Sequence, residues 1–132
     1  MSTVVVTPSH PDPPAAGVRP YRLWVGLLGP PLAWLFHLIA CYAAVERARE
    51  SWPWYVTLHV ASAVFLATAL ACGLIAWVDW RRAGRGWPKS EEGGPIGRTR
   101  FLAVMGIMSG ALFALIIANA WLALFMLDPM WD

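Results

Sequence analysis

Three long stretches of this sequence contain no Asp, Glu, Lys or Arg, and they constrain the fold more than any other feature. They cover residues 23–45, 55–78 and 101–127, which makes them 23, 24 and 27 residues long. About 20 apolar residues in a helix cross the hydrocarbon core of a bilayer, where a helix pairs its own backbone groups. The sequence therefore predicts an all-α membrane protein with three transmembrane helices, at about 22–46, 55–80 and 99–127.

The remaining sequence leaves little room for a separate soluble domain. Only 14% of the 132 residues are charged, whereas soluble domains carry about a quarter. Residues 1–20 are rich in proline and small side chains, which predicts a disordered tail. Residues 81–98 combine glycine, proline and mixed charge, which predicts a flexible basic loop. We expect one three-helix membrane domain over 21–128.

The distribution of cations predicts how the helices are oriented in the membrane. Eight of the ten Lys and Arg residues, Arg22 among them, lie either before the first charge-free run or between the second and the third. Basic residues concentrate on the cytoplasmic side, so we expect a cytoplasmic N-terminus and a C-terminus outside. Contact with anionic lipid explains these cations better than nucleic-acid binding does.

The first predicted helix contains two adjacent prolines and a stripe of small and polar residues. Proline has no amide hydrogen, so Pro30 and Pro31 leave the carbonyls of Gly26 and Leu27 without their helical donors. Such oxygens need cover inside a membrane. At 100° per residue one face collects a set of residues that we expect to point into the bundle: Gly26, Pro30, Ala33, Trp34, His37, Cys41 and Ala44.

The other two helices carry similar small-residue faces. In the second helix the shared face holds His59, Ser62, Ala69, Gly73 and Ala76. In the third, Gly106, Gly110 and Ala114 follow one another at intervals of four, a spacing that permits close helix packing. We expect Gly106 and Gly110 to contact a partner protein as well. The opposite side of the third helix carries Met105, Met108, Asn119 and Met126. We expect this side to contact a partner protein, because methionine adapts to irregular surfaces and a membrane-embedded amide needs a hydrogen-bond partner.

Five polar residues are expected in the outer half of the membrane, where they are able to converge: His37, Cys41, His59, Ser62 and Asn119. One interpretation is structural, with neutral histidines hydrogen-bonded between helices. The alternative is a haem, copper or quinone site that uses His37, Cys41, His59 and Asn119. The two histidines differ in depth by roughly 7 Å, which disfavours their binding the two faces of one haem. Imidazole and thiolate are ligand types that bind copper.

The chain lacks several common sequence motifs of enzymes. It has no GxSxG, GxGxxG or HExxH sequence and no phosphate-binding Walker loop. We therefore expect a protein that is not an enzyme, has no cofactor or metal, and takes no soluble substrate.

Short motifs in the membrane segments resemble a known group of proteins. They are "GPPLAWLFHL" in the first helix, "AWVDWRRAG" at the end of the second, and the small-residue third helix. Together they resemble the small three-helix membrane proteins that bacteria encode beside haem-copper cytochrome c oxidases. The resemblance spans about residues 20–128. It implies a non-catalytic accessory subunit or assembly factor of a respiratory complex in the bacterial inner membrane, in contact with larger membrane subunits, and it assigns no role to individual residues.

Overall fold

The chain forms three long helices in a computed structural model that describes residues 18–87 and 94–126. They are α1 (Pro20–Glu50), α2 (Trp52–Arg82) and α3 (Pro95–Phe125), each of 31 residues, and the described residues contain no strand. Most of the predicted tail and the middle of the predicted loop lie outside these ranges.

All three helices are long and apolar enough to cross a membrane, which confirms the prediction of three spanning segments. A helix of 31 residues is about 46 Å long, and the hydrocarbon core is about 30 Å thick. The helices are longer than predicted at most of their ends. The predicted bounds followed the charge-free runs, but a helix can continue through charged residues outside the hydrocarbon. Each helix has a proline in its first turn, where the missing amide hydrogen costs no helical hydrogen bond.

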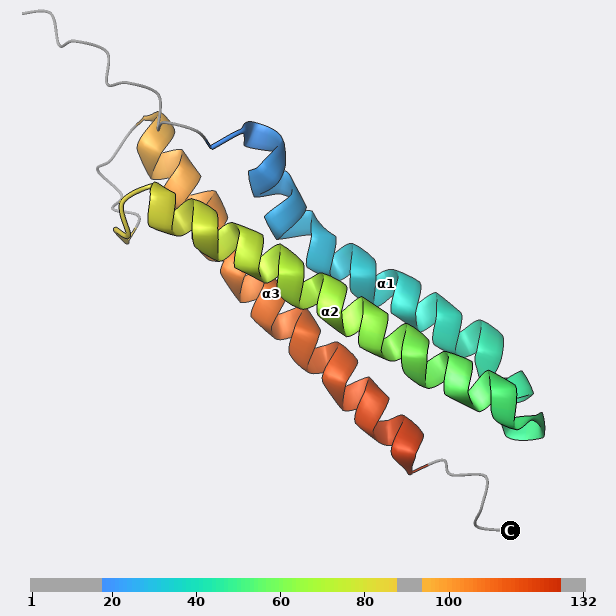
Figure 1. Ribbon diagram of the computed structural model, residues 1–132. Helices are drawn as coiled ribbons and strands as arrows, with labels where there is room; N and C mark the ends of the chain where they lie inside the picture. The colour runs from blue at the N-terminus through green and yellow to red at the C-terminus, as the bar shows by residue number, and fades with distance from the viewer. Residues whose placement is uncertain (1–17, 88–93, 127–132) are drawn as a thin grey trace, which may run out of the picture.

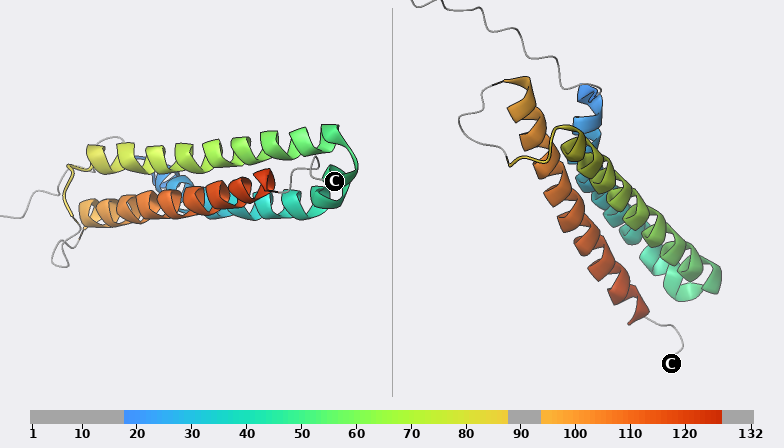
Figure 2. Two further views of the ribbon diagram at one scale, coloured as in Figure 1. Left: turned by 90° about the horizontal axis from the view of Figure 1, so that it is seen from below. Right: turned by 60° about the vertical axis from the view of Figure 1, so that its left-hand side comes forward.

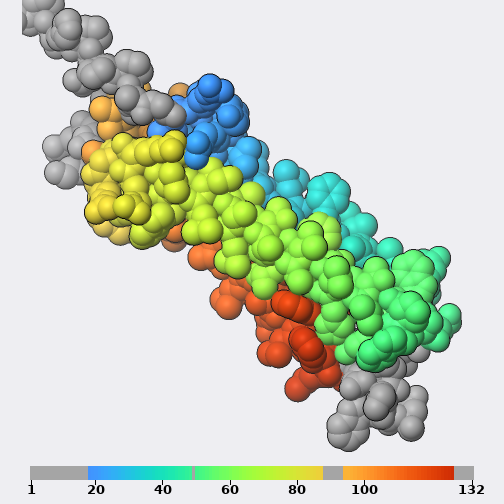
Figure 3. Space-filling model, in the orientation of Figure 1, coloured from blue at the N-terminus to red at the C-terminus, as the bar shows by residue number. Residues whose placement is uncertain are grey.

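The helices pack side by side in one antiparallel bundle (Figures 1 and 2). At one end α1 and α3 begin and α2 ends; we call it the basic end, because it carries Arg22, Arg81, Arg82, Arg98 and Arg100. At the opposite end, the far end, α1 passes into α2 through Ser51. In Figure 3, α2 runs across the visible face with α1 and α3 on either side.

Glycine and alanine bring the three helix backbones together near the middle of the bundle. A methyl group added to Gly110 would lie 2.7 Å from the Cα of Gly73. One added to Gly106 would lie 2.8 Å from the Cβ of Ala76 and 3.2 Å from the backbone carbon of Gly26. Gly106 and Gly110 therefore pack against helices of the same chain.

The two prolines bend α1 without interrupting it. The helix continues through Pro30 and Pro31, and its first turns run at an angle to the rest (Figure 1). The carbonyl of Leu27, which loses its donor to Pro31, accepts a hydrogen bond of 3.0 Å from the Ser109 hydroxyl on α3. The carbonyl of Gly26 lies against the backbone at Gly106. The third helix thus covers the gap that the prolines create.

Candidate functional site

His37 is the centre of a small polar cluster between α1 and α2. Its ring is 2% exposed, and Nε2 lies 3.0 Å from the Ser62 hydroxyl. That hydroxyl donates to the carbonyl of Leu58 at 2.9 Å, so it accepts from His37, which carries its hydrogen on Nε2. The sulfur of Cys41 lies 3.5 Å from the same nitrogen. The imidazole therefore joins α1 to α2 through a chain of hydrogen bonds.

His59 points to the other interface, between α2 and α3. Its Nδ1 accepts a hydrogen bond of 2.8 Å from the indole of Trp121, so a neutral ring carries its hydrogen on Nε2. That nitrogen is buried and has no partner among the described residues. The rings of Tyr55 and Phe125 lie 4.5 and 4.7 Å away, centre to centre. A buried donor without a partner costs about 1–3 kcal/mol, although an aromatic face compensates part of that.

Asn119 lies apart from both histidines, on the exposed surface of α3. Its amide makes no hydrogen bond within the described part of the chain. Thr57 and Thr68 on α2 are also exposed, but each hydroxyl donates to a carbonyl one turn earlier. Asn119 therefore differs from these threonines in presenting an unused donor and acceptor to whatever surrounds the bundle.

The four residues of the cofactor alternative thus occupy three separate environments. His37 and Cys41 lie together, His59 pairs with Trp121, and Asn119 faces outward. Over residues 18–87 and 94–126, no three His, Cys, Asp or Glu side chains are grouped as metal ligands would be. A metal at His37 Nε2 would also have to displace the hydrogen bond to Ser62.

Asn119 belongs to a regular exposed stripe along α3. The stripe consists of residues spaced alternately three and four apart, all exposed: Met105, Met108, Leu112, Leu115, Asn119 and Leu122. A repeat of 3.5 residues keeps one face turned toward a neighbouring helix in a left-handed pair. Transmembrane helices commonly pack in that geometry, with crossing angles near 20°. We call these six residues the α3 stripe.

An ion pair at the basic end was not predicted from the sequence. Asp79 on α2 is 0% exposed, and its carboxylate lies 3.2 Å from the guanidinium of Arg22 on α1. Arg22 was expected only to contribute to the charge asymmetry that orients the helices. The sequence feature that could have indicated this ion pair is Asp79 in "AWVDWRRAG", an isolated acidic residue that directly follows an apolar run.

Comparison of the chain with protein family models, curated proteins and solved structures gives no match. The fold and the polar contacts define a three-helix, multi-pass membrane protein that contacts the lipid bilayer. Among the described residues, the contacts between its helices include small-residue packing, the hydrogen bonds of His37, His59 and Ser109, and the ion pair of Arg22 and Asp79.

Proposed function

We propose that this protein is a non-catalytic accessory subunit or assembly factor that binds a larger membrane protein through the α3 stripe. The single observation that carries the proposal is the exposed amide of Asn119 in a row of Met and Leu side chains. Lipid tails offer no hydrogen-bond partner, and a partner helix does. A polar residue in such a row also fixes the register of two helices.

Methionine and leucine suit the rest of this contact. Met105 and Met108 are 40% and 61% exposed, and methionine side chains adapt to a partner's surface. The small residues Gly106 and Gly110 are already used inside the bundle, so they are not part of the docking surface. The partner contact that we propose therefore depends on shape and on one amide.

The identity of the partner rests on the sequence resemblance. "GPPLAWLFHL" and "AWVDWRRAG" resemble small proteins encoded beside cytochrome c oxidases, so the proposed partner is a subunit of a respiratory complex in the bacterial inner membrane. The excess of cations at the basic end supports a cytoplasmic location for that end. The far end would then face outward.

The haem, copper or quinone alternative is less well supported, because its donors do not converge and His37 Nε2 is already engaged. A visible spectrum and a metal analysis of the purified protein test it directly. A Soret band or stoichiometric copper that disappears in His37→Ala would replace the structural role of His37 with a cofactor site.

Affinity purification of the tagged chain from native membranes, followed by mass spectrometry, tests the accessory-subunit proposal. We expect oxidase subunits to co-purify with the wild-type chain and to be lost from Asn119→Leu. Leu74→Asn places the same amide on the exposed side of α2, where Leu74 is 64% exposed, and it should retain the partner. A wild-type chain that purifies alone, or only with itself, contradicts the proposal.

A further inference from the structure

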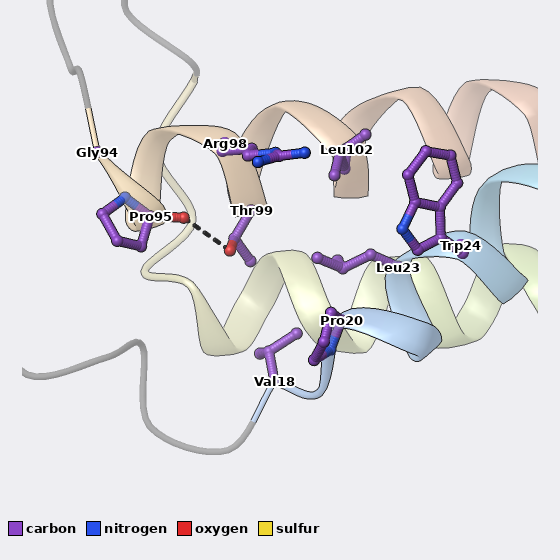
Figure 4. Close-up of a pocket in the computed structure, with 9 residues that line it drawn as sticks. All are labelled: Val18, Pro20, Leu23, Trp24, Gly94, Pro95, Arg98, Thr99 and Leu102. Carbon is purple, nitrogen blue, oxygen red and sulfur yellow. Dashed lines mark hydrogen bonds between the residues drawn. The ribbon is translucent and has the colours of Figure 1, made fainter.

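An open cavity lies at the basic end between the first turns of α1 and the first turns of α3 (Figure 4). Its volume is about 700 Å³, within the 300–1,000 Å³ that small-molecule sites occupy. The residues that matter to its chemistry are Pro20, Leu23, Trp24, Pro95, Arg98 and Leu102.

Packing deeper in the bundle explains why the cavity ends where it does. Gly26 and Gly106 bring α1 and α3 into contact about one turn further along each helix. Leu23 and Leu102 therefore form an apolar floor, and Leu23 is only 7% exposed. The cavity is therefore closed toward the middle of the bundle.

The guanidinium and indole groups of the cavity are donors. Arg98 contributes a guanidinium, and the indole nitrogen of Trp24 lies on the side of its ring that faces Arg98 (Figure 4). None of the described residues that line the cavity is acidic. The Thr99 hydroxyl donates its hydrogen to the carbonyl of Pro95, at 2.8 Å. An anion with an attached apolar portion fits this combination of groups.

The depth of the cavity identifies the kind of anion. Pro20 and Pro95 are the first residues of two membrane-spanning helices, so the cavity lies where phospholipid headgroups lie. Tryptophan favours the same depth. Basic pockets between transmembrane helices bind anionic headgroups.

We propose that this cavity binds the phosphate-bearing headgroup of one anionic phospholipid, with Arg98 and Trp24 as donors and the acyl chains outside the bundle. The cavity shares no residue with the α3 stripe, so lipid binding here does not depend on the proposed partner. A soluble phosphate would satisfy the same donors but would leave the floor of Leu23 and Leu102 unused.

Native mass spectrometry of the full chain in detergent tests the site by titration with phosphatidylglycerol or phosphatidylcholine. We expect one phosphatidylglycerol to be retained in preference to phosphatidylcholine, and millimolar inorganic phosphate not to displace it. Arg98→Gln should weaken binding about fivefold, since a surface cation contributes about a factor of five to headgroup affinity. Leu102→Trp should weaken it at least as much while keeping the charge, because it fills the cavity.

Arg81→Gln is the matched control, since Arg81 is an exposed cation at the same end but does not line this cavity. It should leave binding unchanged. Equal weakening by Arg81→Gln and Arg98→Gln would show a diffuse attraction and overturn the proposal. No preference between the two lipids would overturn it too, and displacement by inorganic phosphate would contradict the lipid assignment. Arg98 is exposed, so its variant tests the site even if Leu102→Trp does not fold.

Discussion

At the scale of single residues, Ser109 has a role that its position in the sequence does not indicate. Its hydroxyl covers the carbonyl of Leu27, which Pro31 leaves without a helical donor. The need for such cover is predictable from the two prolines alone. The identity of the donor is not, because Ser109 lies 82 residues away and reaches Leu27 only through the packing of α3 on α1.

Ser109→Ala should lower the free energy of unfolding by about 1 kcal/mol, because it leaves a carbonyl without a partner inside the membrane. Unfolding in mixed detergent micelles measures this change. Thr68→Ala is the control, since the Thr68 hydroxyl bonds only its own helix at Val64 and should be close to neutral. Equal effects of the two substitutions would contradict the assigned role of Ser109.

The ion pair of Arg22 and Asp79 makes a second prediction at this scale. Arg22→Ala removes the guanidinium that lies 3.2 Å from a fully buried carboxylate and leaves it only the charge of Arg82, which is not within ion-pair distance; this should cost about 3 kcal/mol. In an Asp79→Asn background the same substitution should cost much less, because no buried charge remains. The double-mutant cycle, measured by unfolding, gives the coupling. A coupling near zero would show that the pair does not join α1 to α2.

At the scale of the helices, sequence patterns predicted the faces better than the pairings. The face of α1 that holds Gly26, Pro30 and His37 lies inside the bundle, all three being buried. The periodicity of small residues was enough to identify it. The expectation that His37 and His59 converge depended on depth alone. In the structure, His37 contacts Ser62 between α1 and α2, and His59 contacts Trp121 between α2 and α3. The partners depend on how the three helices are arranged around one another, which depth does not determine.

Gly110→Ala should destabilise the bundle by about 1–3 kcal/mol, the usual cost of adding volume to a packed interior. The new methyl group would meet the Cα of Gly73 at 2.7 Å, and backbone atoms do not move aside as a flexible side chain does. Ala111→Leu adds more atoms to the exposed face of the same helix and should cost far less. Thermal unfolding in detergent compares them, and the reverse order would contradict the packing described above.

At the scale of the whole molecule, the three-helix architecture follows from three charge-free runs, and the distribution of cations predicts its orientation. We predict that the far end is outside the cell. In a cysteine-free background, Ser51→Cys at the far end should react with a membrane-impermeant maleimide in intact cells. Trp87→Cys, at an exposed position of the basic end, should react only after permeabilisation. The opposite labelling pattern would invert the predicted topology.

The central claim is that α3 presents a partner-binding stripe centred on Asn119, and photocrosslinking in native membranes tests it most directly. A photoreactive amino acid replaces Leu115, which is 69% exposed beside Asn119, or Leu74, which is 64% exposed on α2. We expect a crosslink from position 115 to one oxidase subunit, lost when Asn119→Leu is added, and only lipid adducts from position 74. Lipid adducts alone from position 115, or the same protein crosslinked from both positions, would contradict it.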